Sequence, residues 1–241
     1  MKYLSSFIIS LIWIHTSYAQ STEEIIQKHI EVIGGEKWDS ISTFFIAANT
    51  TSSEGYVSIA KTVVRGRSVR NDITVQPLDA ARSEMKYYIV IDGDKGWKYL
   101  PGDPTHTIYT LYTNEVEELR DELDYEDPFI RYIEKDREIN LLGIVYDEKE
   151  ELYKFSVRYK SGKERILYLS TKTLLIEQSE TTGINGRVRY QDYEMLPEGI
   201  LIAKKISSKE GVLKIEKVKV NPPVDPEIFI PSDKNQFTYT H

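Results

Sequence analysis

The sequence predicts a mainly β protein with a few helices (α+β), in which most of the chain forms one antiparallel sheet. From residue 41 onward, short runs of β-branched and aromatic residues alternate with turn residues such as Gly162 and Gly211. The connections between these runs are too short for the crossovers that join parallel strands, so successive strands should pair as hairpins in a meander. Clear helical spacing is confined to the start and the middle of the chain.

Residues 1–19 have the pattern of a secretory signal peptide. Lys2 supplies the positive charge, Leu4–Ile14 form a short apolar run, and residues 17–19 make a small-x-small cleavage site that ends at Ala19. A membrane anchor is the alternative, but the apolar run is too short to cross a bilayer comfortably. We therefore expect a soluble protein that is exported to the periplasm by a cleaved signal peptide.

Composition narrows the class of partner. The chain has 241 residues, no cysteine and a formal net charge of −7. Because no disulfide is possible, apolar burial has to hold the fold together. A net acidic surface argues against nucleic acid as a partner and against electrostatic attachment to anionic lipid. The net charge gives no information about apolar ligands, so an apolar ligand remains a possible partner.

Residues 21–34 predict an amphipathic helix. Ser21 or Thr22 can cap its first turn, and Gly34 and Gly35 end it. Apolar residues recur at helical spacing, and His29 lies among them. We interpret His29 as a boundary residue of a packed helix, because that role is far commoner than a ligand-binding one.

Two groups of strands are expected after this helix. The first group lies near residues 41–50, 55–65, 67–76, 84–92, 96–100 and 105–112. The second group lies near residues 138–147, 151–160, 163–170, 174–182, 187–195, 200–208 and 212–220. Turn residues separate most of these runs, which favours short hairpin connections.

Some of these strands are apolar on both faces, for example residues 44–46 and 87–91. Such a strand has to be covered on both sides. The N-terminal helix can provide one cover, and sheet curvature, a lid or a ligand has to provide the other. The Pro-rich segment from Asn221 cannot be a central strand. We interpret it as a closing turn with Phe229 packed inward, followed by a flexible tail at 232–241.

A helical interruption separates the two groups of strands. Thr113 or Asn114 starts it, with Glu117 placed for a capping box, and a second start follows at Asp127–Pro128. Two short amphipathic helices inside a meander should lie across the mouth of the curved sheet. They could be a lid over a cavity or a permanent plug of the core, and the sequence favours neither. The acidic run 115–127 is interpreted as a solvated face.

No motif for catalysis, metal binding or cofactor binding marks the chain. The sequence contains no HExxH, CxxC, GxSxG, P-loop or dinucleotide fingerprint, and its histidines lie far apart. The 17 tyrosines are more simply explained by cross-strand packing than by a tyrosine-lined cavity. We expect no cofactor, no metal and no enzymatic activity.

Several segments resemble the periplasmic lipoprotein carrier family (LolA-like) and its broader relatives, the lipoprotein-sorting proteins common in Bacteroidota. They are IIQKHIEVIGGEKWDSISTF, IDGDKGWKYLPGDPTHTIY, DPFIRYIE, LYLSTKTLLIEQSE and VNPPVDPEIFIPSD. The first is similar to the family's opening helix and first strand, and the third falls where the family has a lid helix. The resemblance covers nearly the whole mature chain, and the order of the segments carries it more than any single motif.

The resemblance implies one domain, at residues 20–231, that forms an incomplete β-barrel whose opening is covered by helices around an apolar cavity. In the carrier, an arginine on an early strand hydrogen-bonds carbonyls of the lid. Arg65 is the matching candidate, although Arg65–Gly66 stands where the carrier has Arg-Pro. The residues expected to line the ligand site are Phe45, Arg65, Tyr87, Trp97, Tyr99, Phe129 and Ile133.

The resemblance further implies a monomeric carrier that holds lipoprotein acyl chains or another lipid, with a membrane-bound donor or acceptor protein as a further partner. Two other classes stay open. One is a periplasmic sensor or structural domain that binds a protein partner without lipid cargo. The other is an enzyme that acts on an apolar substrate, for which the sequence marks no nucleophile or metal set.

Overall fold

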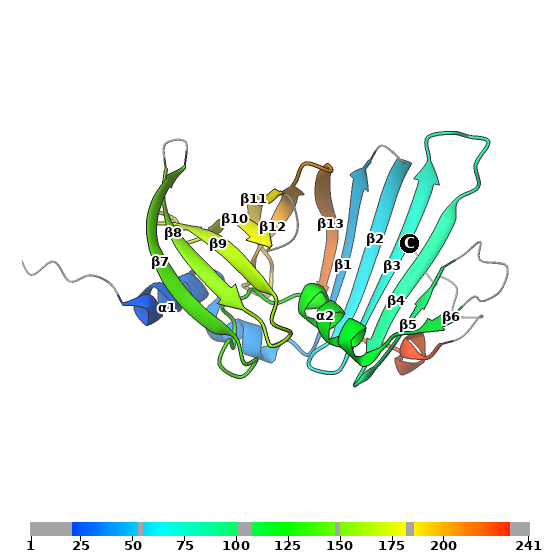
Figure 1. The fold of residues 1–241 in the computed structure, drawn as a ribbon, viewed down its shortest axis with the longest axis horizontal. Coiled ribbons are helices and arrows are strands. Elements are labelled where there is room, and N and C mark those ends of the chain that lie inside the picture. The colour runs from blue at the N-terminus through cyan, green and yellow to red at the C-terminus, as the bar shows by residue number, and fades with distance from the viewer. Residues whose placement is uncertain (1–20, 53–54, 101–107, 148–149, 182–185, 232–241) are drawn as a thin grey trace, which may run out of the picture.

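The computed structural model describes residues 21–52, 55–100, 108–147, 150–181 and 186–231. The predicted signal peptide and C-terminal tail lie outside the described residues. The described chain forms one 13-stranded antiparallel sheet with a few helices (Figure 1). The expected mainly β fold is confirmed, and each expected strand is found within a few residues of its position.

The strands before the interruption are β1 (Thr43–Thr51), β2 (Gly55–Val64), β3 (Ser68–Pro77), β4 (Met85–Asp92), β5 (Lys95–Tyr99) and β6 (Ile108–Thr110). Those after it are β7 (Glu138–Asp147), β8 (Glu150–Arg158), β9 (Glu164–Ser170), β10 (Ile176–Thr181), β11 (Arg187–Met195), β12 (Leu201–Ser207) and β13 (Val212–Val220). The helices are α1 (Thr22–Val32) and α2 (Thr113–Leu123), with short 3-10 helices η1 (Gly35–Ser40) and η2 (Pro226–Phe229).

The first and last strands meet in the middle of the sheet. The strand order is β6-β5-β4-β3-β2-β1-β13-β12-β11-β10-β9-β8-β7, and β1 pairs antiparallel with β13. Asn221 holds this junction, because its side-chain oxygen accepts a hydrogen bond from the Ser42 N–H at 2.7 Å. The strands β6 and β7, which are neighbours in sequence, are therefore the two edges, and the curved sheet remains an unclosed barrel.

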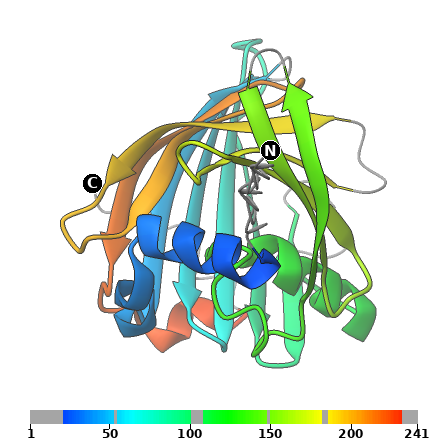
Figure 2. The same cartoon turned by 90° about the vertical axis from the view of Figure 1, so that its left-hand side faces the viewer.

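Both α-helices begin where their capping residues place them. The Oγ of Ser21 accepts a hydrogen bond from the Glu24 N–H at 3.1 Å, which satisfies one of the free donors of the first turn of α1. The helix α2 begins at Thr113 as expected, but Glu115 rather than Glu117 accepts the Tyr112 N–H, at 2.8 Å. Figure 2 shows α1 and α2 at the same end of the strands.

The helices α1, α2 and η1 cover the inner face of the sheet. A cluster of buried side chains from β1 to β4 packs against η1 and α2, and Ile25 and Ile26 of α1 pack against β8 and β9. On the outer face, Tyr88 and Val90 pack with Phe229 of η2. The second cover of the doubly apolar strand β4 is therefore the C-terminal segment, which the sequence had suggested only as a closing turn.

The expected second helix of the interruption is absent. Residues 128–136 form hydrogen-bonded turns instead, beginning with the bond from the Ile130 N–H to the Asp127 carbonyl at 2.9 Å. Arg131 has a φ of 49°, in the left-handed region that a right-handed helix cannot contain. Its guanidinium hydrogen-bonds the carboxylate of Glu126, five residues earlier in the chain, at 2.6 Å, and this charge pair accompanies the turns that replace the helix.

Candidate functional site: the inner wall and the polar latch beneath it

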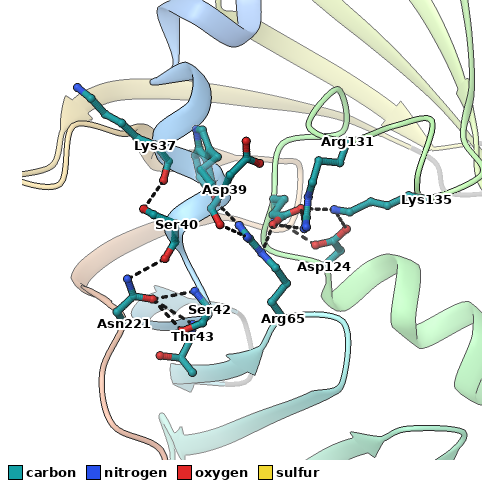
Figure 3. A network of polar contacts seen from close by, with 12 residues as sticks. Lys37, Asp39, Ser40, Ser42, Thr43, Arg65, Asp124, Arg131, Lys135 and Asn221 are labelled. Atoms are coloured by element: carbon teal, nitrogen blue, oxygen red, sulfur yellow. Dashed lines mark hydrogen bonds and ion pairs between the residues drawn. The ribbon is translucent and has the colours of Figure 1, made fainter.

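A network of charged side chains ties the segment between α2 and β7 to the rest of the protein. We call residues 124–137 the linker, and we call the network the polar latch. Its members are Arg65, Asp124, Glu126, Arg131, Lys135 and Arg137. Figure 3 shows Arg65, at the end of β2, between η1 on one side and the linker on the other.

Arg65 uses all of its guanidinium nitrogens. Its Nε lies 2.9 Å from the Glu126 carboxylate, and its Nη1 donates to the Asp39 carbonyl at 2.7 Å. Its Nη2 donates to the Trp38 carbonyl. One side chain thus joins β2, η1 and the linker. The resemblance implied bonds to lid carbonyls, whereas the carbonyls that Arg65 reaches belong to η1.

Glu126 is the centre of the latch. Its side chain is 1% exposed and contacts Arg65, Arg131 and Lys135, the last at 2.5 Å. Burial by itself would raise the pKa of Glu126, but the hydrogen bond from Arg131 and the charge of Lys135 hold the pKa below its ordinary value of 4.5. The carboxylate is therefore ionised at neutral pH. The interpretation of residues 115–127 as a solvated face was wrong for Glu126.

The linker also plugs the lower part of the inner face with apolar side chains. The ring of Tyr125 stacks on Phe44 of β1 with centroids 4.6 Å apart, and Trp38 lies beside both rings. Burial and the nearby Glu126 carboxylate raise the pKa of Tyr125 to about 12, so its hydroxyl stays protonated. Ile130 completes this packing. At this end Tyr125 and Ile130 fill the inner face, as expected for a plug or for a lid that is shut.

His29 joins α1 to the linker. Its Nδ1 lies 2.6 Å from the Leu174 carbonyl, and its Nε2 lies 3.1 Å from the Asp127 carboxylate. Burial by itself would lower the pKa of His29, but the charge of Asp127 and the Leu174 carbonyl outweigh it and raise the pKa above 6.5. Only the protonated ring carries a hydrogen on both nitrogens, so the cation suits both acceptors.

We expect the contribution of His29 to stability to depend on pH. A raised folded-state pKa means that this contribution is complete below pH 6.5 and is lost as the pH rises through the folded pKa. Urea unfolding of the wild type and of His29→Gln, measured from pH 5.5 to 9, should therefore show a stability difference that shrinks as the pH rises. A difference that is constant over this range would contradict the ion pair with Asp127.

Above the plug, the inner face keeps a set of half-buried apolar side chains. Side chains alternate between the faces of a strand, so residues on β2, β3 and β4 that share the parity of buried Val63, Val69 and Ile91 point inward. We call the following half-buried set the inner wall. It consists of Val57, Ile59, Ile73, Tyr87, Ile206, Leu213 and Ile215.

The inner wall belongs to strands from both halves of the chain. Ile215 of β13 lies opposite Ala48 of β1, and Leu213 lies opposite Ile206 of β12. The helices lie at one end of the strands, and the strands extend beyond them (Figure 1). The wall also carries polar groups, since Lys61 and Asn71 face each other on β2 and β3. The surface is an open apolar wall with a polar band above the plug.

A cleft of about 510 Å³ opens beside the latch. Its walls include Arg65, Glu126 and the apolar side chains of Val63, Val69 and Ile91. Further bases and acids also line it, so the cleft combines apolar side chains with charged ones. Among the described residues, no group of three or more His, Cys, Asp or Glu side chains is arranged to hold a metal ion. None of the described helices has the length and apolar character to span a membrane.

The structure separates the residues that the sequence placed in one site. Tyr87 lies on the inner wall. Phe45 points to the outer face, where the ammonium of Lys219 lies 5.7 Å from its ring centroid. Trp97 and Tyr99 also lie on the outer face, in the cluster with Phe229. The predicted common face was wrong for these three, because a one-residue change of register reverses which side chains point inward.

The two linker residues of the expected lining differ sharply. Phe129 is 0% exposed and packs edge-on against His29 and Phe155, so it belongs to the core. Ile133 is 74% exposed and lines nothing, because the turn at Arg131 directs it outward. Glu126 was not predicted as a functional residue from the sequence, because no local feature distinguishes it from the other acidic residues of 115–127.

Comparisons with known proteins agree with this architecture. A DUF1329 family protein from Desulfovibrio piger has 13% sequence identity and a TM-score of 0.57, over 85% of this chain and 94% of that one. A LolA superfamily protein from Nitrosomonas europaea has 12% identity and a TM-score of 0.52, over 86% and 96%. No family model and no curated protein matches the sequence. At these identities the likeness shows the fold: the chain has a LolA-like unclosed β-barrel.

Proposed function

We propose that the protein is a periplasmic carrier that holds lipoprotein acyl chains, or another lipid with a long hydrocarbon chain, against the inner wall. The supporting observation is the half-buried apolar wall that strands from both halves form beyond the reach of the helices. The LolA-like fold agrees with such a role. Of the sequence-predicted lining residues, we assign only Tyr87 to this lipid site.

Burial of a hydrocarbon chain supplies the affinity. Each methylene that leaves water completely contributes about 0.8 kcal/mol, so roughly 8 kcal/mol is the upper limit for ten of them, and cover on one side contributes a part of this before the entropic cost of binding. The inner wall covers one side of such a chain rather than enclosing it. A cargo held this way can pass sideways to a membrane-bound donor or acceptor protein. The protein would act as a monomer, without a cofactor and by binding rather than catalysis.

The polar latch would serve this function by fixing the floor of the site. Arg65 and Glu126 hold η1 and the linker against the sheet, which places Tyr125 and Ile130 below the inner wall. A hydrocarbon chain that lies on the wall would end on this apolar floor. The latch is therefore proposed as a positioning element, and its charges are engaged with one another rather than with cargo.

A charge placed on the inner wall should abolish lipid uptake. We expect Ile73→Asp to weaken the binding of a fluorescent long-chain fatty acid by about tenfold or more, because the bound chain would have to desolvate a carboxylate. Thr74→Asp is the matched control, since Thr74 is the next residue of β3, is also half-buried and points to the opposite face. Circular dichroism of both variants checks that they fold.

Equal binding by the two variants would place the lipid elsewhere. Native mass spectrometry of the protein purified from the periplasm gives an independent reading. Only empty protein, together with no uptake of the fatty acid by the wild type, would overturn the proposal. In that case, a pull-down that yields one stoichiometric protein and no lipid would favour a sensor or structural domain on the same fold.

A further inference from the structure

The edge strand β7 has the features of a docking site for an extended polypeptide. It pairs with β8 along nearly its whole length, and no described strand pairs with its other edge. At ten residues it is far longer than the opposite edge strand β6, which has three. Alternate N–H and C=O groups of an edge strand point away from the sheet and can pair with another chain.

β7 has little of the protection that edge strands usually carry. Its sequence, EINLLGIVYD, contains no lysine and no proline. One bulge, between Leu141 and Gly143, interrupts the ladder. Apolar side chains beside the edge are unusually open: Leu142 is 55% exposed, Ile144 is 54% exposed and Tyr146 is 77% exposed. The half of the strand above the bulge therefore has an outer edge that no described strand pairs with, and apolar side chains beside that edge.

Both ends of β7 are acidic. Glu134, Asp136 and Glu138 lie at one end, and the side chain of Glu138 is 71% exposed. Asp147, Glu150 and Glu151 lie at the other end. Arg158 lies 3.9 Å from Glu138 and Arg187 lies 2.9 Å from Asp147, so these two carboxylates are partly compensated. Lys135 and Arg137 both bind Asp124 in the polar latch, and the remaining exposed acids leave both ends of β7 with an acidic excess.

This charge pattern selects among the possible occupants. Antiparallel pairing of β7 with a second copy along its full length would set Glu138 opposite Asp147, and like charges directly opposite destabilise a strand pair. A segment with basic residues at both ends and alternating apolar residues between them would instead complement the edge at every position.

We propose that β7 binds an extended segment of a partner protein by strand addition, and that this segment is apolar at alternate positions and carries Lys or Arg at both ends. The backbone of β7 supplies the hydrogen bonds. Ile144 and Tyr146 contact the alternate apolar side chains, and Glu138 and Glu150 pair with the basic ends. The binding is independent of the lipid that we propose for the inner wall.

A synthetic peptide with blocked ends, Lys-Thr-Val-Thr-Val-Thr-Val-Thr-Lys, is the probe. On titration with the full mature chain, we expect hydrogen exchange to slow at the amides of β7 above the bulge and not on strands such as β2 that are paired on both sides. The same peptide with Glu in place of Lys should bind about tenfold more weakly at low salt, and this difference should shrink as salt is added.

Tyr146→Lys is the test variant, because a lysine on the edge repels the basic peptide and opposes strand addition. We expect its Kd for the Lys-ended peptide to rise by about tenfold. Tyr56→Lys is the matched control: Tyr56 is also exposed, at 39%, but lies on β2, which pairs with both β1 and β3. Its Kd should stay unchanged.

Three results would overturn the proposal. The first is peptide binding without any slowing of exchange on β7. The second is slowed exchange that needs no peptide and appears with a dimer in light scattering, which would make a second copy the occupant. The third is equal binding of the Lys-ended and Glu-ended peptides. The comparison of the two peptides uses wild-type protein only, so the test holds even if a variant fails to fold.

Discussion

Glu126→Ala is expected to lower the free energy of unfolding by about 3–5 kcal/mol, because it removes a buried carboxylate that neutralises three partly buried cations. The carboxylate is 1% exposed and contacts Arg65, Arg131 and Lys135. Without it, Arg65 and Arg131 lose this carboxylate while they stay partly desolvated, and Lys135 keeps Asp124 as a partner. Urea unfolding followed by circular dichroism measures the change.

A surface acid provides the control for this prediction. Glu138→Ala removes a carboxylate that is 71% exposed and lies 3.9 Å from Arg158, so we expect a loss of less than about 1 kcal/mol. Added salt should weaken the Glu138 pair more than the Glu126 contacts, since exposed charges are screened more strongly. A small effect of Glu126→Ala, similar to that of Glu138→Ala, would show that the polar latch does not hold the linker.

The pH dependence of the stability of Glu126→Ala provides a second test of the polar latch. The pKa of Glu126 is held below 4.5 in the folded protein, so its contribution is complete above pH 4.5 and is lost as the pH falls through the folded pKa. The stability difference between wild type and Glu126→Ala should therefore shrink in acid. This direction is opposite to the one expected for His29, which allows the two effects to be separated.

Phe129→Ala is expected to cost about 3–5 kcal/mol, the range for a large aromatic removed from a core that cannot collapse around the space. Phe129 is 0% exposed and lies between His29 on α1 and Phe155 on β8, with ring centroids 5.1 Å and 5.2 Å away. Its removal would therefore loosen α1, the linker and the sheet together. Thermal and urea unfolding both report this loss.

Ile133→Ala is the matched control within the same segment. Both residues lie in the segment for which the sequence predicts a second helix, but Ile133 is 74% exposed. We expect its replacement to change stability by less than about 0.5 kcal/mol. Comparable losses for the two variants would mean that the linker is helical in solution, with both side chains on one buried face.

Much of the fold followed from local pattern. Turn residues and β-branched runs located the strands, and Ser21 located the start of α1. These features are predictable because a turn, a cap and a strand's alternation each depend on residues close together in the chain. The position of the interruption was also predictable, since its helical spacing differs from that of the flanking strands.

The candidate site was less predictable. Alternation showed that Phe45, Tyr87 and Trp97 each share a face with their second neighbours, but not which face points inward. That choice depends on what covers each face, and the covers come from distant segments: η1 and α2 on one side and η2 on the other. Glu126 was missed for the same reason, because Arg65 lies far from it in the sequence.

The sequence by itself determined the positions of the described strands and of α1 and α2, the hairpin connections and the apolar composition of the strands, but not the turns of residues 128–136. Only the tertiary structure decided that β1 pairs with β13, that β6 and β7 remain as edges, and that a buried carboxylate organises the linker. The physical reason is the separation along the chain between the residues that interact. Backbone conformation responds to neighbours along the chain, whereas burial and charge pairing depend on segments that only folding brings together.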